Sequence, residues 1–591
     1  MLTVRALRLL IGASSRRFAL YIALILIVSL LPVLQAWLMK QVVDRLAAPG
    51  AAAALDPATL MLAALVLLAM VVPAALLPIQ EILFALLEND AVAAIDRRLM
   101  QAGAQLADLV RIEQPGFQDE LRMLQDEAWR LSRLIAVIQN LLSALLTIIG
   151  LLLLLAGLNP LLPLLLLATG VPSLLVERRI NQLKYQAMVK LSRPAREMDY
   201  CVRVTSDPAT AKEIRVFGLG DFFVQRFRER ANVAFAEVTQ LRYRQLGWSA
   251  LFGGLHAMML GGGFWYVAAQ AGTGRLTLGD VALYLVAIAQ TESRTIFLIT
   301  SASLWHGIWM YLRTLFAFFD SAGPAVALPP PNQGLPTPAP FQSGLELQQV
   351  DFYYPTSDTP VLNDLNAQLP AGRVTALVGA NGAGKSTLVK LLTRMYDPTS
   401  GAILLDGAPL PTYDLAGLRG QISADYQDFA RFALTLRENI AVGAFGKDQG
   451  ALTVEEAAHW SGADRVAAKL AQGYETMLTR TYEDGVDLSG GEWQAVALAR
   501  CFVRDAGLVI FDEPTAALDA EAEEQLFQHF RELTQGKTAL LISHRFSTVR
   551  MADHILVIEG GRIVESGSHA ELMAQGRRYA ALFEMQAGWY V

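Results

Sequence analysis

Six apolar stretches in the first half of the chain constrain its fold more than any other feature. Each is long enough to cross roughly 30 Å of hydrocarbon as a helix. The third and fourth are separated only by Asn159 and Pro160, so they form a helical hairpin. We therefore expect an all-α bundle of six membrane-spanning helices. The stretches are 18–39, 60–79, 135–158, 161–176, 248–269 and 278–309.

The composition agrees with a membrane protein. Hydrophobic residues make up 53% of the chain and charged residues only 18%, which is more apolar than a soluble protein with a charged surface. A length of 591 residues is too great for one hydrophobic core and predicts at least two domains. Cys201 and Cys501 are the only cysteines, so a disulfide framework and a Cys-rich metal site are excluded. The formal net charge of −6 gives no argument for a nucleic-acid partner.

The placement of Lys and Arg predicts the orientation in the membrane. Basic residues fill the long segments after the second and the fourth apolar stretch, whereas the other loops are short and carry few cations. The two long segments and both termini are therefore expected on the cytoplasmic side, in a bacterial plasma (inner) membrane. The Arg-rich start leaves a mitochondrial address as the alternative.

A proline-rich segment divides the chain into two domains. Pro329, Pro330, Pro331, Pro336 and Pro338 belong to a composition that resists both helix and sheet. After it the apolar runs shorten to strand length and alternate with helical patterns, as in a soluble α/β domain. The predicted organisation is a transmembrane domain at 1–320 with two long cytoplasmic loops, a linker at 321–344 and an α/β nucleotide-binding domain at 345–591.

The strongest local motif is a phosphate-binding loop. An apolar run at 374–378 leads into Gly-Ala-Asn-Gly-Ala-Gly-Lys-Ser-Thr and then into a helical pattern. Glycines let successive backbone N–H groups face one anion at a helix N-terminus, Lys385 can reach the β- and γ-phosphates, and Ser386 can bind Mg²⁺. The residues expected to contact nucleotide here are Gly379, Asn381, Gly382, Gly384, Lys385, Ser386 and Thr387.

Two further patterns suit nucleotide hydrolysis. The apolar run 508–511 ends in Asp512 and Glu513, whose side chains leave a strand in opposite directions. Asp512 can therefore serve Mg²⁺ while Glu513 polarises the attacking water. Ser489 and Glu492 have the spacing of a helix capping box, but the two glycines between them weaken a helix that needs only a cap. Such glycines suit a second anion-binding helix end.

These residues resemble the ATP-binding cassette (ABC) family over essentially the whole chain, and specifically half-transporters of the exporter type. The phosphate loop, the signature Leu-Ser-Gly-Gly-Glu and the acidic strand end occur in the family's order. The resemblance implies further roles: Tyr354 stacks on adenine, Gln427 links metal and membrane domain, His544 meets the γ-phosphate, and Asp519 lies in a loop across the dimer interface. Glu513, His544, Gln427 and Lys385 are then the catalytic set, and Ser386, Gln427 and Asp512 the metal set.

The resemblance also implies a dimer. One chain's phosphate loop and the other chain's Ser489, Gly490 and Gly491 would enclose each ATP, so the partner is a second copy or a related half-transporter. Coupling helices are expected near 112–117 and 204–208, with Glu483 in a loop that meets them. Glu492 departs from the family, whose signature usually ends in Gln, and it adds a carboxylate near the partner's triphosphate.

The function expected from this resemblance is ATP-driven export of a small molecule, peptide or lipid, with ATP and Mg²⁺ as cofactors and membrane lipid around the helices. The alternatives are an importer on the exporter fold and an ATP-gated channel or regulatory subunit. Glu292 and Arg294 fall inside the sixth apolar stretch, where ionisable residues are costly unless they pair or meet water. Substrate binding and a structural interhelical contact are both open for them.

Overall fold

The computed structural model describes residues 2–587 except 49–55, 165–182, 184–191, 209, 322, 324–325, 331–332, 356, 447–451, 483 and 515–527. The chain forms two compact units. The first comprises 1–103 with 120–321, and the second comprises 104–119 with 322–591.

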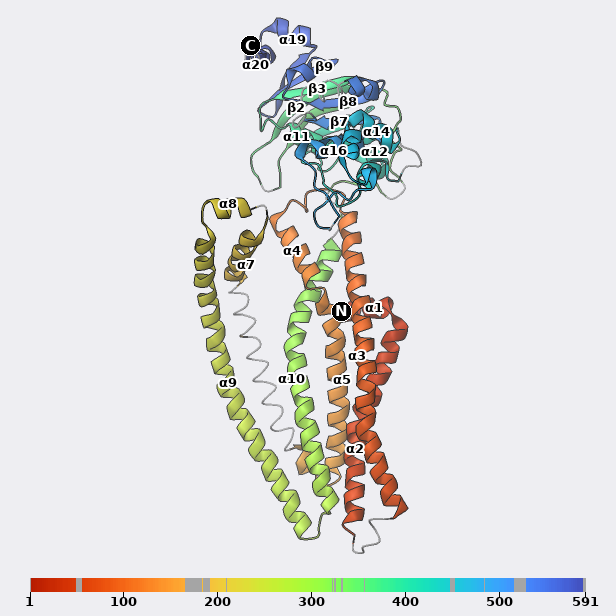
Figure 1. Cartoon of the computed structure of the whole chain (residues 1–591), viewed down its shortest axis with the longest axis vertical. Helices are drawn as coiled ribbons and strands as arrows, with labels where there is room; N and C mark the ends of the chain where they lie inside the picture. The colour runs from red at the N-terminus through yellow and green to blue at the C-terminus, as the bar shows by residue number, and fades with distance from the viewer. Residues whose placement is uncertain are drawn as a thin grey trace. The chain divides into compact units, whose positions relative to one another are not determined.

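Long helices build the first unit (Figure 1). Helix α10 packs against α5, α2 and α9, and α9 also packs against α7. Hydrogen bonds also join the helices: the Thr147 hydroxyl on α5 donates to the carbonyl of Ser29 on α2 at 2.8 Å. The helices are α1 (Leu2–Ala13), α2 (Ser15–Leu46), α3 (Pro57–Gln105), α4 (Pro115–Asp126), α5 (Trp129–Ala156), α7 (Ser192–Ser206), α8 (Ala211–Val216), α9 (Gly220–Gly272) and α10 (Leu278–Ser321).

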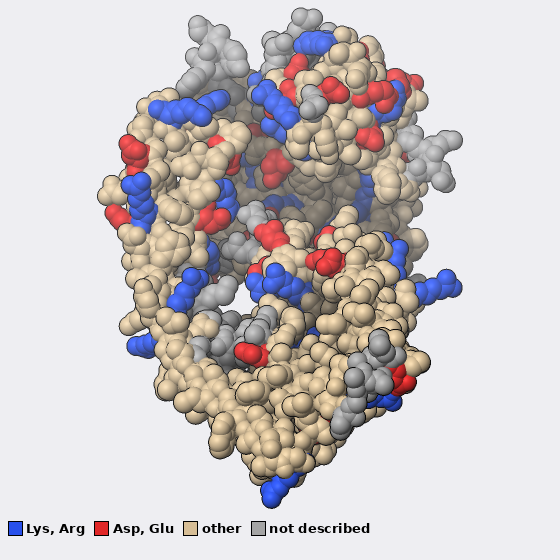
Figure 2. Space-filling view, turned by 60° about the horizontal axis from the view of Figure 1, so that its bottom comes forward, with Lys and Arg blue, Asp and Glu red and all other residues tan. Residues whose placement is uncertain are grey.

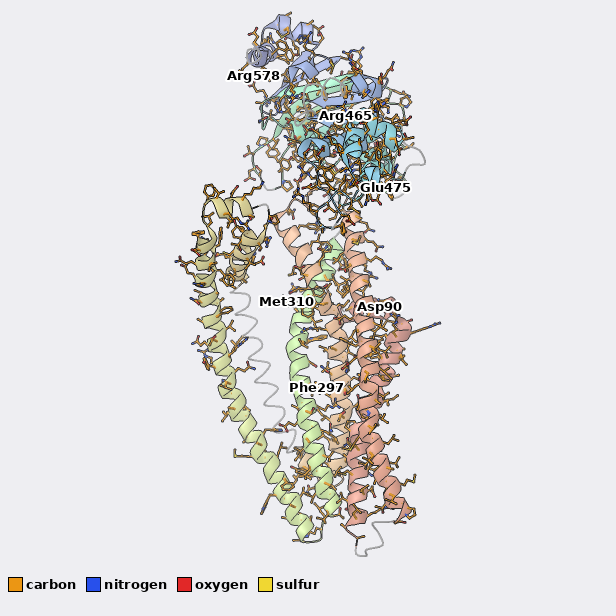
Figure 3. The ribbon with its side chains drawn as sticks, viewed as in Figure 1. Asp90, Phe297, Met310, Arg465, Glu475 and Arg578 are labelled. Carbon is orange, nitrogen blue, oxygen red and sulfur yellow. The ribbon has the colours of Figure 1, made fainter. Side chains whose placement is uncertain are left out.

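The surface of this unit suits lipid. Large apolar side chains such as Leu67 and Leu153 are exposed, and Figure 2 shows broad areas with few Lys, Arg, Asp or Glu side chains. Apolar surface of this extent is not stable against water. Charged groups on neighbouring helices pair instead, as Arg17 does with Asp90, labelled in Figure 3, at 2.7 Å.

Three of the six predicted spans are confirmed as candidates by length and composition. Within the described residues, Ser15–Leu46, Pro57–Gln105 and Met123–Ala156 are long and apolar enough to cross a membrane. The fourth predicted span lies largely outside the described residues. The fifth and sixth lie within α9 and α10 and stay predictions.

The second unit contains two sheets. The smaller, antiparallel sheet has the order β2-β1-β4-β5, and the larger has the order β10-β9-β3-β8-β7-β6. The larger sheet is parallel except for β10. The strands are β1 (Gly344–Phe352), β2 (Leu362–Pro370), β3 (Val374–Gly379), β4 (Ser400–Leu405), β5 (Ala408–Pro409), β6 (Ile422–Asp425), β7 (Leu508–Asp512), β8 (Thr538–Ile542), β9 (His554–Glu559) and β10 (Arg562–Gly567).

Burial explains why these segments are strands. Every residue of β7 and of β8 is buried, as expected for central parallel strands covered on both faces. In β2, buried and open residues alternate from Leu365 to Leu369, which fits an antiparallel sheet. The helices are α11 (Lys385–Leu392), α12 (Leu415–Gly420), α13 (Leu436–Ala441), α14 (Val454–Ser461), α15 (Ala463–Lys469), α16 (Gly490–Phe502), α18 (Phe546–Val549), α19 (His569–Gln575) and α20 (Arg578–Ala587), with 3-10 turns at Leu410–Thr412, Val442–Ala444 and Gly473–Glu475.

Residues 104–119 pack with the sheets of the second unit although they precede it by some two hundred residues in sequence. The backbone N–H of Leu109 donates to the carbonyl of Met395 at 3.1 Å. The Asp108 carboxylate accepts from the backbone N–H of Val326 at 3.3 Å. The first predicted coupling segment, 112–117, is a turn up to residue 114 and then the start of α4. At 204–208, the second predicted coupling segment, α7 ends at Ser206.

Candidate functional site

Four neighbouring parallel strands bring the predicted catalytic residues to one edge of the larger sheet. The strands lie in the order β3-β8-β7-β6. Because the carboxyl ends of parallel strands meet at the same edge, whatever follows them is brought together. Those followers are the phosphate loop after β3, His544 after β8, Asp512 and Glu513 at the end of β7, and Gln427 after β6.

The phosphate loop can be built only with glycine at two of its positions. Gly384 has φ +105, and a Cβ there would lie 2.6 Å from the Leu362 side chain. A Cβ on Gly379 would lie 2.4 Å from the carbonyl oxygen of Ile558. The loop then enters α11, whose first N–H groups have no partner within the helix and attract an anion. Asn381 and Gly382 are exposed at the tip of the loop.

Lys385 is held by the loop itself. Its Nζ donates to the carbonyls of Gly379 at 2.9 Å and Ala380 at 3.0 Å, and the side chain is buried. Burial lowers the pKa of Lys385, although Glu513 and Asp512 nearby oppose that shift. A buried ammonium that donates to neutral carbonyls has much to gain from an anionic partner, and a phosphate in the loop would provide one.

Ser386 and Asp512 offer oxygen ligands to a divalent cation. The Ser386 hydroxyl donates to Asp512 Oδ2 at 3.0 Å. Burial, with repulsion from Glu513, raises the pKa of Asp512 despite that hydrogen bond. A cation would relieve this strain on the carboxylate, so the donor set fits Mg²⁺, which takes few protein oxygens and completes its shell with phosphate and water. Among the described residues no cluster of three or more His, Cys, Asp or Glu side chains could hold a metal without such help.

Glu513 lies at the centre of the remaining predicted catalytic residues. Its Oε1 is 2.7 Å from His544 Nε2, and its Oε2 accepts from Gln427 Nε2 at 3.2 Å. Its backbone has φ +58, which is uncommon for a residue other than glycine and costs energy. Hydrogen bonds from Glu513 N to the Ile542 carbonyl, at 2.9 Å, and from Gln494 to the Glu513 carbonyl, at 3.0 Å, hold this conformation.

Comparison with known proteins agrees with this geometry. Residues 362–516 match the family model described as "ABC transporter". A solved bacterial Atm1-family ABC exporter with ATP bound superposes with a TM-score of 0.79 at 24% identity, over 97% of this chain and 98% of that one. The chain has the fold of an ABC exporter. Residues 322–591, called the cassette below, contain the match to the ABC transporter model, and the apolar helices of the first unit make the chain an integral membrane protein.

Sequence relatives point the same way over different lengths. An ATP-dependent lipid A-core flippase of Yersinia pestis is 45% identical over 244 residues, which are 41% of each chain. The subtilin transport ATP-binding protein SpaT of Bacillus subtilis is 28% identical over 496 residues, 83% of this chain and 79% of that protein. The match to the flippases thus spans less than half of their length.

The signature segment of this ABC exporter fold forms a capping box at the start of α16. The Ser489 hydroxyl accepts from the Glu492 backbone N–H, and the Glu492 carboxylate accepts from the Ser489 backbone at 3.0 Å. Its other oxygen lies 3.3 Å from Lys469 Nζ. Hydrogen bonds from the Ser489 backbone and hydroxyl, with the Lys469 charge, lower the pKa of Glu492. Glu492 therefore turns back onto its own helix, while Gly490 and Gly491 form the first residues of α16.

Replacing Glu492 separates its capping role from its charge. We expect Glu492→Ala to lower the stability of the cassette by about 1 kcal/mol, because the capping box is lost. Glu492→Gln keeps an acceptor for the Ser489 backbone and should change stability by less than about half of that. Thermal unfolding of the two variants beside wild type checks the order. A Gln variant as unstable as the Ala variant would show that the charge, through Lys469, matters more than the cap.

Tyr354 lies beside the phosphate loop, as the prediction for an adenine-stacking residue requires. It follows β1, is half-buried, and its hydroxyl is 3.1 Å from Thr387 Oγ1. Its ring meets those of Phe352 and Tyr396 edge to face, with centroids 5.0 and 5.5 Å away.

Sequence reasoning missed a buried carboxyl group next to this site. Asp425 ends β6, and burial together with Asp512 raises its pKa to about 8. Within the described part of the chain no hydrogen bond reaches its Oδ1. Asp425 also lines a cavity of about 400 Å³ with Arg419 and Arg500. The sequence feature that could have identified Asp425 is an acidic residue at the end of a short predicted strand, two positions before Gln427.

Other predicted residues stand apart from this cluster or outside the described residues. Asp519 and Glu483 lie outside them. In the helical unit, Arg294 donates to Ser143 on α5 at 3.0 Å and lies 5.7 Å from the ring of Phe297, labelled in Figure 3. Glu292 is exposed, and within the described residues no ion pair joins it to Arg294. An interhelical contact is thus present for Arg294, whereas substrate binding by either residue stays a prediction.

Proposed function

We propose that this chain hydrolyses ATP to drive export across a membrane. One observation carries the proposal: Glu513 contacts both Gln427 and His544 beside the phosphate loop, in a chain with apolar membrane helices. A carboxylate so held has the position required of a general base for an attacking water. The flippase and the subtilin transport protein among the relatives support ATP as the fuel and export as the direction.

Each residue then has a distinct task in hydrolysis. Lys385 leaves the carbonyls of Gly379 and Ala380 to bind the β- and γ-phosphates, where its charge is better satisfied. Ser386, Asp512 and Gln427 would hold Mg²⁺, which supplies charge neutralisation on the phosphate oxygens. Glu513 accepts the proton of the attacking water, and His544 keeps that carboxylate in place.

A dimer of two such chains is part of the proposal. In a closed pair, Ser489, Gly490 and Gly491 at the N-terminus of α16 would face the triphosphate bound by the partner chain. A helix N-terminus favours an anion. Because Glu492 is engaged by Ser489 and Lys469, its carboxylate does not oppose this encounter. A second copy is the simplest partner, since this chain has a full set of predicted catalytic residues.

The cargo we propose is an amphiphile, either a lipid or a peptide. The flippase acts on lipid A-core and the SpaT protein on subtilin, so the relatives favour these two classes. Both relatives are bacterial, which favours a bacterial plasma membrane. The placement of Lys and Arg favours a cytoplasmic position for the cassette and both termini.

The purified full-length chain in lipid nanodiscs tests this function. We expect Mg²⁺-dependent ATP hydrolysis from a particle with the mass of two chains, and stimulation by the cargo class. Lipid A-type lipids and subtilin are compared as stimulants, and inside-out vesicles then measure ATP-dependent uptake of the better one. No hydrolysis by a well-folded particle would contradict the proposal for this chain acting alone and would indicate a second, different subunit.

A further inference from the structure

The carboxylate of Glu113 connects residues 104–119 to the helix of the phosphate loop. Its Oε1 accepts a hydrogen bond from Lys390 Nζ at 2.7 Å. Its Oε2 accepts from the hydroxyl of Tyr396 at 2.5 Å. Lys390 lies on α11 and Tyr396 four residues after that helix ends. The Glu113 carboxylate therefore binds both the helix and the segment that follows it.

Both ends of this ion pair are charged at neutral pH. Burial opposes ionisation of Glu113, but the hydrogen bonds from Lys390 and Tyr396 outweigh it, and the pKa of Glu113 is lowered. Burial likewise acts to lower the pKa of Lys390, but the bond to Glu113 outweighs it and the pKa is raised. Charge-assisted hydrogen bonds of this kind are roughly twice as strong as neutral ones.

The same two donors contact the ring of Tyr354. Lys390 Nζ lies 5.4 Å from the centroid of the Tyr354 ring and 5.9 Å from that of Tyr396. The Tyr354 and Tyr396 rings meet at 86°. A cation near an aromatic face and an edge-to-face ring pair each stabilise one ring orientation. The position of Tyr354 therefore depends on where Lys390 and Tyr396 are held.

We propose that Glu113 is a positioning residue for recognition of the nucleotide base. It fixes Lys390 and Tyr396 against Tyr354, and so links the docking of residues 104–119 to the base stacked on Tyr354. This inference rests on the proposed function, because it needs ATP in the phosphate loop with its adenine on that ring. Glu113 touches no nucleotide itself and acts through its two donors.

Thermodynamic linkage makes the effect reciprocal. If docked residues 104–119 favour the ring orientation that binds adenine, bound adenine favours the docked segment by the same factor. Phosphates bound in the loop would contact Lys385 at the start of α11, whereas Lys390 lies near its end, so their binding should depend much less on Glu113. A merely structural ion pair would affect the affinities for ATP and for a ligand without a base equally. A change in the ratio of these two affinities is therefore specific to the proposal.

Equilibrium binding in full-length protein tests the proposal without any need for turnover. In a Glu513→Gln background in nanodiscs, we expect Glu113→Gln to raise the dissociation constant of MgATP about fivefold, the lower end of the range for linked sites. Binding of magnesium tripolyphosphate, which has no base, should change less than about twofold by the same reasoning. An unchanged affinity for ATP, or an equal loss for both ligands, would overturn the proposal.

Two further variants test whether Glu113 acts on the Tyr354 ring through Tyr396. Tyr396→Phe removes only the hydroxyl that Glu113 accepts from, and should weaken ATP binding in the same direction. The double variant Glu113→Gln with Tyr396→Phe should lose less ATP affinity than the sum of the two single losses, because the carboxylate and the hydroxyl act as one unit. Fully additive losses would contradict the arrangement.

Asp108→Asn is the matched control for loosening of the segment. Asp108 lies on the same segment and accepts hydrogen bonds from the Val110 and Val326 backbones. We expect it to leave the preference for ATP over tripolyphosphate unchanged. If it reduces that preference as much as Glu113→Gln does, docking in general and not Glu113 sets the base affinity, and the proposal fails.

Hydrogen exchange measures the reciprocal effect in the same samples. ATP should slow amide exchange in residues 104–119 of the Glu513→Gln protein, and slow it less when Glu113→Gln is added. Protection that is equal in both proteins would contradict the linkage. If the parent protein binds no ATP at all, the proposed function itself fails, which distinguishes that outcome from failure of this inference alone.

Discussion

Glu513→Gln should lower the rate of ATP hydrolysis by about 1000-fold, in the range expected when a general base is removed. The amide keeps the size of the side chain and can still meet His544 and Gln427, whose contacts with Glu513 are 2.7 and 3.2 Å long. It cannot accept the proton of the attacking water. Phosphate release in nanodiscs measures the loss, and equilibrium binding measures the affinity.

ATP binding should survive this change, with a dissociation constant within about threefold of wild type, because Glu513 acts only in the transition state. Glu455→Gln is the matched control, since Glu455 pairs with Arg437 at 2.6 Å and lies on α14, which is none of the elements that carry the predicted site. Its hydrolysis rate should match wild type. Substantial turnover by Glu513→Gln would mean that another group activates the water, and His544 would be the next candidate.

Lys385→Met should weaken ATP binding by about 100-fold, or about 2.7 kcal/mol, as expected for the loss of hydrogen bonds between charged groups. The methionine keeps the length of the side chain and fills the buried position that Lys385 occupies. It also removes a buried ammonium that, in the described part of the chain, donates hydrogen bonds to the Gly379 and Ala380 carbonyls alone. The nucleotide-free protein should therefore be as stable as wild type or slightly more stable.

Opposite changes in affinity and stability make this prediction specific. Equilibrium binding of MgATP and thermal unfolding without nucleotide are measured on the same samples. Lys537→Met is the control for removal of a lysine charge, because Lys537 pairs with Asp505 at 3.2 Å and lies outside the site. If Lys385→Met bound ATP as well as wild type, the loop backbone alone would hold the phosphates and our assignment of Lys385 would be wrong.

Local patterns in the sequence were sufficient for much of the cassette. The loop from Gly379 to Ser386, the acidic end of β7 and the cap of α16 are formed by residues close in sequence, and the structure contains each of them at the predicted position. Helix α11 begins at Lys385, inside the motif. The helix thus takes in the end of the motif, since its first N–H groups face the phosphate position.

Patterns were less informative about the membrane unit. Length and apolar composition identify α2, α3 and the α5 region as membrane segments, because exclusion of polar groups from lipid is a property of each segment alone. The roles of Glu292 and Arg294 depend on which helix each side chain faces. Only the packing shows that Arg294 reaches Ser143 on α5, at 3.0 Å.

The sequence by itself determined the kind of protein and the chemistry at its strand ends, because spans, glycine loops and caps depend on neighbouring residues. Tertiary structure alone decided which distant groups meet. It placed Glu113 on Lys390 and Tyr396, buried Asp425 beside Asp512, and held Glu513 at positive φ between Gln427 and His544. Such contacts depend on strand order and on the path of the chain between elements, which a linear pattern of residue types does not specify.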